Sequence, residues 1–214
     1  MRLLVSIVLA ASIGGSAYAA ELPPAPEQVR PLLLGSHLPD APVRNIDGES
    51  TSLFKAVAGK PAVLVFYRGG WCPYCNLQLS ELRLVEKDLQ ALGYQMIAIS
   101  PDRPEELRKT LGKDELSYTL LSDSTAAAIK AFGIAYRVDK PTLAKLVGFG
   151  IDLEKASGES HHALPVPAVY IVDGEGVLQF SYVHPDYRVR VPSEVVLAAA
   201  KAVAGHRHVL QPKS

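Results

Sequence analysis

Two cysteines separated by two residues stand between a buried-strand pattern and an amphipathic-helix pattern, and this arrangement constrains the fold more than any other feature. Residues 61–67 form a continuous apolar run rich in branched and aromatic side chains, typical of a strand that is covered on both faces. Within residues 76–92, leucines recur near a period of 3.6, which predicts an amphipathic helix. Cys72 and Cys75, the only cysteines of the chain, therefore lie at a strand–turn–helix junction.

The remaining chain continues this alternation of strands and helices. Hairpins are predicted around Asn45-Ile46-Asp47-Gly48 and around the turn at residues 173–176. The other expected elements are strands at 95–100, 118–121, 169–172 and 177–183 and helices at 104–111, 122–132 and 191–203. This order predicts an α/β protein, a three-layer α/β/α sandwich with a central mixed β-sheet. Residues 136–165 show a weaker pattern and are interpreted as a partly helical insertion.

The N-terminal residues have the layout of a secretory signal. Arg2 precedes a short apolar core at residues 3–13, and Ala17-Tyr18-Ala19 supplies a small-x-small cleavage pattern. We expect a signal peptide at 1–19, cleavage before Ala20, and a periplasmic or secreted mature protein that is not held in a membrane. Residues 20–31 are interpreted as a proline-rich linker, 32–205 as one domain, and 206–214 as a flexible tail.

The charge balance and the available metal ligands indicate which partners and cofactors the chain can bind. With 22 basic and 22 acidic side chains and a pI near 7.0, the chain has no overall basic field for nucleic acid. A zinc site built on the two cysteines would need two further ligands, for which His161 and His162 are the plausible donors. We expect neither a metal nor another cofactor.

The sequence Trp71-Cys72-Pro73-Tyr74-Cys75 carries the clearest chemical signal. A cysteine at a helix N-terminus faces unpaired N–H groups and the positive end of the helix dipole, so the Cys72 thiolate is favoured. Pro73 fits the first helical position, where no hydrogen bond is lost. The pair is consistent with a redox-active dithiol, half of a zinc site or a structural disulfide. Since a disulfide closing so short a loop stabilises little, redox chemistry explains the pair best.

Three segments together resemble one known family. FYRGGWCPYC at residues 66–75, GSHLPD at 35–40 and LSD at 121–123 are similar to the alkyl hydroperoxide reductase and thiol-specific antioxidant family, a peroxiredoxin-like branch of the thioredoxin superfamily. The resemblance covers about residues 32–204. It implies a thioredoxin-like fold, antioxidant reduction of hydroperoxides through a Cys72/Cys75 dithiol–disulfide cycle, and an external thiol reductant.

The same resemblance leaves the reaction and the attacking cysteine open. The peroxiredoxin register places the attacking role on Cys75, whereas thioredoxins attack with the first cysteine, here Cys72. An arginine that peroxiredoxins use near the dithiol aligns with Pro167. This difference favours an alternative function, thioredoxin- or glutaredoxin-like exchange with protein disulfides. A second alternative is a non-enzymatic module with a structural disulfide. The oligomeric state is not predicted.

Several further side chains are candidates for substrate binding or thiolate stabilisation. Arg68 could supply the missing cation, and Trp71 could form a flat wall beside the dithiol. Val166 and Pro167 resemble the segment with a cis-proline that presents a backbone edge to substrate disulfides in thioredoxins. The candidate site residues are thus Cys72 and Cys75 as catalytic residues, with Arg68, Trp71, Pro73, Tyr74, Val166 and Pro167 around them.

Four other polar residues have more ordinary interpretations. His161 and His162 could approach the dithiol as a general base, but a solvent-facing loop pair is the preferred interpretation. Asp102 precedes a predicted helix and Asp123 lies at the start of another, and both are interpreted as helix caps.

Overall fold

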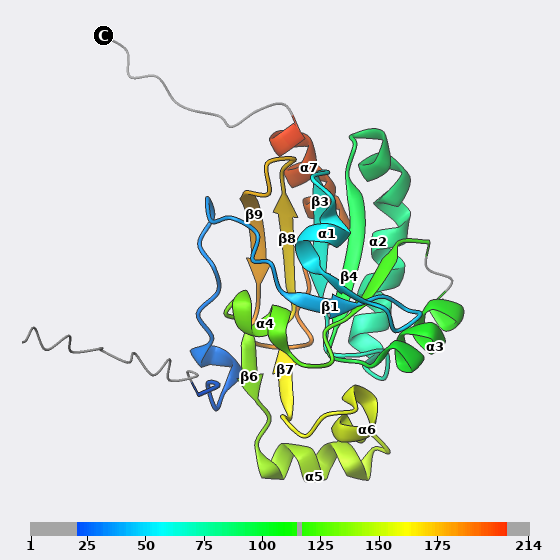
Figure 1. The fold of residues 1–214 in the computed structure, drawn as a ribbon, viewed down its shortest axis with the longest axis vertical. Coiled ribbons are helices and arrows are strands. Elements are labelled where there is room, and N and C mark those ends of the chain that lie inside the picture. The colour runs from blue at the N-terminus through cyan, green and yellow to red at the C-terminus, as the bar shows by residue number, and fades with distance from the viewer. Residues whose placement is uncertain (1–20, 115–116, 205–214) are drawn as a thin grey trace, which may run out of the picture.

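The computed structural model describes residues 21–114 and 117–204, and a seven-stranded mixed sheet forms their centre (Figure 1). The strand order is β2-β1-β5-β4-β3-β8-β9. β3 is parallel to β4 and antiparallel to β8, so the dithiol follows a central strand of the sheet. The strands are β1 (Pro42–Arg44), β2 (Ser50–Ser52), β3 (Ala62–Phe66), β4 (Gln95–Ser100), β5 (Thr119–Ser122), β8 (Ala168–Val172) and β9 (Leu178–Val183).

Helices cover both faces of this sheet, which confirms the predicted three-layer sandwich. Alternate side chains of β3 enter two separate cores: Leu64 and Phe66 face one core, and Val63 and Val65 face the other. The first core contains residues of α1 and α4, and the second contains residues of α2, α3 and α7. These helices are α1 (Leu53–Val57), α2 (Pro73–Ala91), α3 (Pro104–Asp114), α4 (Ala127–Ala131) and α7 (Ser193–Ala204).

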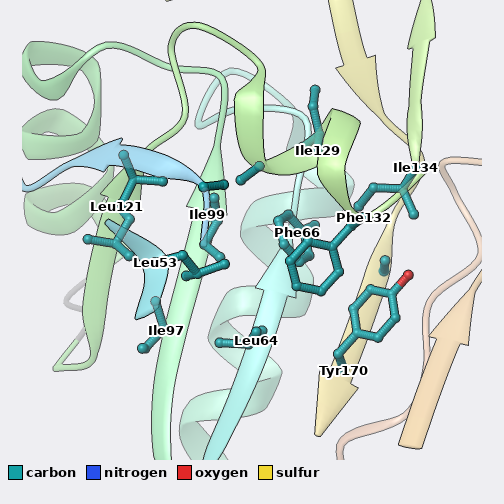
Figure 2. Packing of buried hydrophobic residues seen from close by; sticks show 14 of the residues in the cluster. Leu53, Leu64, Phe66, Ile97, Ile99, Leu121, Ile129, Phe132, Ile134 and Tyr170 are labelled. Atoms are coloured by element: carbon teal, nitrogen blue, oxygen red, sulfur yellow. The ribbon is translucent and has the colours of Figure 1, made fainter. Parts of the chain in front are cut away.

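An aromatic cluster fills the first core beside the end of β3. The rings of Phe66 and Phe132 lie 4.6 Å apart between centroids, and those of Phe132 and Tyr170 lie 4.9 Å apart. Figure 2 shows the three rings grouped together, with Ile134 beside them. All three aromatic side chains are fully buried, so this cluster fixes the end of the strand that leads to the dithiol.

Replacing Phe66 by alanine is expected to lower the free energy of unfolding by about 3–5 kcal/mol, because it leaves a cavity inside this cluster. Chemical denaturation followed by circular dichroism measures the change. Leu84→Ala is the matched control: Leu84 is 79% exposed on α2, and its loss should change the free energy of unfolding by less than about 0.5 kcal/mol. Equal effects of the two substitutions would contradict the assignment of Phe66 to the core.

The insertion forms a small subdomain at one end of the molecule (Figure 1). Strands β6 (Ala135–Arg137) and β7 (Ala163–Pro165) pair antiparallel, and α5 (Lys140–Gly148) and α6 (Leu153–Ser157) lie between them in the sequence. The predicted partly helical character is confirmed. The insertion has its own small core, against which Trp71 packs, so it contacts the segment that carries the dithiol.

Two sequence-based expectations are corrected by the fold. The helix expected at 122–132 is confined to α4, because the Asp123 side chain accepts hydrogen bonds from the backbone N–H groups of Ala128 and Ile129 and a turn precedes the helix. The segment interpreted as a linker packs on the domain instead: Arg30 N–H donates to the Gly133 carbonyl at 2.9 Å, and a 3₁₀ turn spans Pro26–Gln28. The expected signal peptide and tail lie outside the described residues.

None of the helices in the described ranges is long and apolar enough to cross a lipid bilayer.

Candidate active site

The two thiols lie at the N-terminal end of α2. The helix begins at Pro73 rather than at residue 76, with Cys72 as its N-cap residue and the proline at its first position, as predicted for the motif. The Cys72 carbonyl accepts the backbone N–H groups of Cys75 at 3.0 Å and Asn76 at 3.1 Å. Both cysteines are free thiols; Cys72 is 1% exposed and Cys75 is fully buried. The structure therefore describes a reduced, enclosed dithiol.

The surroundings separate the acidities of the two thiols. A hydrogen bond from the Cys75 side chain, aided by the Cys75 backbone N–H and the positive charges of Arg68 and Arg190, lowers the pKa of Cys72 to about 6, against the opposing effect of burial. Burial, followed by the hydrogen bond and the charge of Cys72, raises the pKa of Cys75 well above its ordinary value. At neutral pH, Cys72 is thus the thiolate and Cys75 the thiol.

The rate of Cys72 alkylation by iodoacetamide is expected to reach half its maximum near pH 6, because the thiolate is the reactive form and its pKa is about 6. Mass spectrometry of the reduced protein after short exposures across the pH range measures this profile. Cys75→Ala removes the largest stabilising contact and should move the midpoint to higher pH. A wild-type midpoint near the pKa of a free cysteine, about 8.5, would contradict the electrostatic description.

Arg190 is a site residue that the sequence analysis missed. Its Nη2 atom donates to Cys75 Sγ at 3.4 Å, and its Nη1 atom donates to Gln78 Oε1 at 2.7 Å. Its Nε and Nη2 atoms also bind the Tyr187 carbonyl, which fixes the guanidinium group. The side chain comes from the segment between β9 and α7 and is 115 residues distant from Cys75 in sequence, and no motif joins the two. A fixed cation therefore lies at the dithiol, although the expected position holds Pro167.

Arg68 lies on the loop between β3 and α2 and is buried. Its guanidinium carbon is 5.1 Å from the Trp71 ring centroid and 4.3 Å from that of Tyr187. Both stacking contacts hold its charge near Cys72, whose pKa it helps to lower. Tyr74 is 41% exposed and packs edge-to-face on Tyr187 at 5.7 Å. The structure thus brings Arg68, Trp71 and Tyr74 together around the dithiol, as the sequence suggested.

The expected backbone edge at Val166 and Pro167 is not available. The cis bond expected at Pro167 is not observed, since the described part of the chain contains only trans peptide bonds. Val166 N–H donates to the Ile134 carbonyl at 3.0 Å, and the Pro167 carbonyl accepts His184 N–H at 3.2 Å. Both residues are buried, and these internal partners occupy the groups with which an incoming peptide strand would pair.

The two histidines of the insertion are held by other contacts. His161 is half-buried, with Nε2 2.7 Å from the Ser124 carbonyl and Nδ1 accepting Ala163 N–H at 2.9 Å. His162 pairs with Glu154 at 2.8 Å. Because both ring nitrogens of His161 are engaged, it links the insertion to the domain rather than serving as a free base. No group of three metal-binding side chains occurs among the described residues.

The loop that carries Cys72 needs its two glycines. Gly69 has φ +152°, and a Cβ there would collide with the Trp71 ring; a Cβ on Gly70 would collide with Thr110 Oγ1. Gly70 N–H donates to Asp102 Oδ2 at 2.7 Å, and Asn76 Nδ2 donates to the Gly70 carbonyl at 2.9 Å. Asp102 thus binds this loop, whereas the sequence predicted it as a helix cap; the capping prediction for Asp123 is confirmed.

Comparisons with known proteins agree with this architecture. Residues 34–181 match the AhpC/TSA family. A putative peroxiredoxin bcp from Haemophilus influenzae is 33% identical over 106 residues, covering 50% of this chain and 68% of that protein. Peroxiredoxin Q of Oryza sativa subsp. japonica is 29% identical over 148 residues, covering 69% of this chain and 58% of that protein.

Solved structures show the same fold at lower identity. Peroxidoxin BcpB from Mycobacterium tuberculosis superposes with a TM-score of 0.61 at 17% identity, covering 79% of this chain and 97% of that one. Reduced Prx3 from Vibrio vulnificus, solved with hydrogen peroxide, gives a TM-score of 0.63 at 21% identity, covering 79% and 99%. With the family match and the buried dithiol, these likenesses show that the chain belongs to the AhpC/TSA family, and that it is a peroxiredoxin-like, thiol-based oxidoreductase of the thioredoxin superfamily.

Proposed function

We propose that the protein reduces small hydroperoxides, with Cys72 as the attacking thiolate and Cys75 as the resolving thiol. The observation that carries the proposal is the separation of the two acidities: Cys72 has a pKa of about 6 beside two arginines, and Cys75 is a buried thiol within reach of it. The names of the related peroxiredoxins support the substrate class. The 1% exposure of Cys72 also favours a small substrate over a protein disulfide.

The proposed cycle has three chemical steps. The Cys72 thiolate attacks one peroxide oxygen, so that an S–O bond forms and the O–O bond breaks; the leaving alkoxide takes a proton and departs as an alcohol, or as water when the substrate is hydrogen peroxide. Cys75 then attacks the Cys72 sulfenic acid, forming a disulfide and releasing water. An external dithiol reductant restores both thiols. Arg190 and Arg68 supply positive charge where negative charge develops on the departing oxygen.

The assignment of Cys72 as the attacking residue departs from the peroxiredoxin register, which points to Cys75. The physical environment supports Cys72, because a nucleophile must be ionised and the pKa of Cys75 is raised by burial. The contact from Arg190 to Cys75 Sγ lowers the Cys75 pKa, but burial is the larger influence there.

Protein disulfide exchange receives less support from the geometry. An exchange catalyst needs an accessible sulfur and a backbone edge for its partner, whereas Cys72 is nearly enclosed and the Val166–Pro167 edge is already paired. A purely structural disulfide is also disfavoured, since both cysteines are free and their acidities differ strongly.

Export to the periplasm, or secretion, is part of the proposal. It rests on the signal-like pattern of residues 1–19, and in such an oxidising compartment a dedicated thiol reductant would be required. Mass determination of the protein recovered from the producing cell tests this point: cleavage should leave Ala20 as the first residue.

The test of the function is a stopped-flow reaction of the reduced protein with hydrogen peroxide, followed through the fluorescence of Trp71, the only tryptophan. Because Trp71 precedes Cys72, oxidation of the dithiol should change its emission. A second-order rate constant orders of magnitude above that of free cysteine at the same pH supports the proposal. A rate equal to that of free cysteine would refute it.

A further inference from the structure

Tyr187 contacts both arginines of the site. It lies in the segment between β9 and α7, and its ring centroid is 4.3 Å from the guanidinium carbon of Arg68. Its backbone carbonyl accepts the Nε and Nη2 atoms of Arg190 at 2.9 Å and 2.7 Å. Arg190 Nη2 also donates to Cys75 Sγ. One residue thus links a cation on the loop before Cys72 with a cation bound to the Cys75 thiol.

The Tyr187 ring contacts residues on both sides of Cys72 in the sequence. Arg68 lies four residues before Cys72, and Tyr74, on which the ring packs edge-to-face at 5.7 Å, lies two residues after it. The Tyr187 side chain is 40% exposed. The ring therefore lies against the segment that carries Cys72, while part of its surface remains in solvent.

The backbone around Tyr187 is fixed by hydrogen bonds. His184 N–H donates to the Pro167 carbonyl at 3.2 Å, which ties the start of the segment to the residue before β8. Val189 N–H donates to the Asp186 carbonyl at 3.0 Å, which closes a turn with Tyr187 inside it. The ring and the carbonyl of Tyr187 are therefore held in a defined place relative to the sheet.

No ion pair neutralises Arg68 or Arg190 within residues 21–114 and 117–204. Arg68 is only 5% exposed, and its Nε atom has no hydrogen-bond partner in this part of the chain. Asp186, the acid beside Tyr187, pairs with Arg188 at 2.8 Å. A carboxylate would cancel much of the charge of a buried arginine, whereas an aromatic face and a carbonyl oxygen stabilise the cation and leave its charge in place.

Other aromatic residues complete the surroundings of Arg68. The Trp71 ring centroid lies 5.1 Å from its guanidinium carbon. Burial raises the pKa of the Tyr136 phenol in β6, and the charge of Arg68 and a hydrogen bond with it oppose this effect. Of these three aromatic residues, Tyr187 is the one that also binds Arg190.

We propose that Tyr187 is the positioning residue for both cations, with its ring holding Arg68 and its carbonyl holding Arg190 beside the dithiol. The inference rests on the proposed function, in which the two charges favour the Cys72 thiolate and the departing oxygen. Two like charges near one site repel each other, so a residue that binds both lowers the free-energy cost of keeping them together. Tyr187 acts through the arginines and takes no part in bond making or breaking.

Tyr187→Leu tests the ring, because leucine keeps a carbonyl for Arg190 and removes the aromatic face from Arg68. The second-order rate constant with hydrogen peroxide should fall by about tenfold. The midpoint of Cys72 alkylation by iodoacetamide should move upward from about pH 6, by less than in Cys75→Ala, because Cys75 makes the largest contribution there and Arg68 and Arg190 make smaller ones.

Two variants control for the ring substitution. Tyr187→Phe keeps the aromatic face and should leave the rate constant within about twofold and the midpoint unchanged. Phe54→Leu makes the same kind of change at a 55% exposed position on α1 and should also leave both unchanged. A loss in Tyr187→Phe as large as that in Tyr187→Leu would overturn the proposal, since the ring would then not be the group that matters.

A double-mutant cycle separates positioning from a general structural role. If the ring acts through Arg68, Tyr187→Leu should change the rate constant by less than about twofold in an Arg68→Met background. It should still cost about tenfold in an Arg190→Ala background, where Arg68 is present. A full tenfold loss in the Arg68→Met background would mean that the ring supports the site in another way, and would overturn the proposal.

Tyr187→Gly tests the carbonyl, because glycine removes the ring and also loosens the backbone that holds Arg190. Its rate constant should fall about tenfold below that of Tyr187→Leu. Adding Arg190→Ala to Tyr187→Gly should then change the rate less than Arg190→Ala does in the wild-type protein. Equal rate constants for Tyr187→Gly and Tyr187→Leu would overturn the part of the proposal that concerns Arg190.

The alkylation assay distinguishes this inference from the proposed peroxidase function, because it needs no peroxide. If the wild-type protein failed to react with peroxide, but Tyr187→Leu raised the Cys72 midpoint and Tyr187→Phe did not, the substrate proposal would be wrong and the role of Tyr187 would stand. An unchanged midpoint in Tyr187→Leu would refute the role of Tyr187 even in an active peroxidase.

Discussion

Replacing Cys72 by serine is expected to reduce the second-order rate constant with hydrogen peroxide by at least about a thousandfold, because the thiolate with the lowered pKa is the nucleophile and Cys75 is held as a buried thiol. Stopped-flow fluorescence of Trp71, checked by a peroxide-consumption assay, measures the loss. Removing the only ionised sulfur leaves the site with no comparable nucleophile.

Cys75→Ser is the matched control for this prediction. The serine hydroxyl can replace the thiol as a hydrogen-bond donor to the Cys72 thiolate, so the first oxidation should continue at a similar rate. The reaction should then stop at the sulfenic acid, which dimedone labels, and consume a single equivalent of peroxide. The reverse pattern, in which Cys75→Ser loses the reaction and Cys72→Ser keeps it, would assign the attack to Cys75 as the peroxiredoxin register suggests.

The layers of the fold could be predicted because each depends on a local pattern. The apolar run before the dithiol became the central strand β3, since a strand covered on both faces needs apolar side chains on both. The leucine period became α2, and the Asp-Gly turn at residues 173–174 became the β8–β9 hairpin. The helix expected at 122–132 was shortened by the Asp123 side chain, whose competing hydrogen bonds leave no trace in a periodicity.

The site was predicted only where its residues are neighbours in sequence. Cys72, Cys75, Arg68 and Trp71 come from one segment, and the structure places them together. Asp102 lies in another loop, and its position before a helix suggested a cap until the bond to Gly70 was seen. The sequence around Pro167 resembles a segment that presents its backbone to a substrate. In the structure, however, Val166 N–H is already bonded to the Ile134 carbonyl, and the sequence pattern around the insertion does not predict this pairing.

Arg190 was also not predicted, because it is distant in sequence from the dithiol. Its replacement is the second prediction with a large effect on the reaction rate. Replacing Arg190 by alanine is expected to lower the rate constant with hydrogen peroxide by about 100-fold, since the loss of one fixed donor at a site of developing oxyanion charge typically has this cost. Arg190→Lys should recover little of the rate, because an ammonium group cannot reproduce the fork that binds Cys75, Gln78 and the Tyr187 carbonyl together. Stopped-flow kinetics of both variants provides the measurement.

Two comparisons separate the possible causes of that loss. Arg188→Ala is the matched control, since Arg188 is an exposed neighbour paired with Asp186 and its loss should leave the rate within about twofold. Measurement at about pH 8, well above the Cys72 pKa of about 6, then tests how Arg190 acts. If the guanidinium only favoured the thiolate, the deficit of Arg190→Ala would disappear there, where Cys72 is ionised in any case. A deficit that persists at this pH means that Arg190 stabilises the charge that develops on the departing oxygen. The segment between β9 and α7 would then supply the cation that the sequence lacks at position 167.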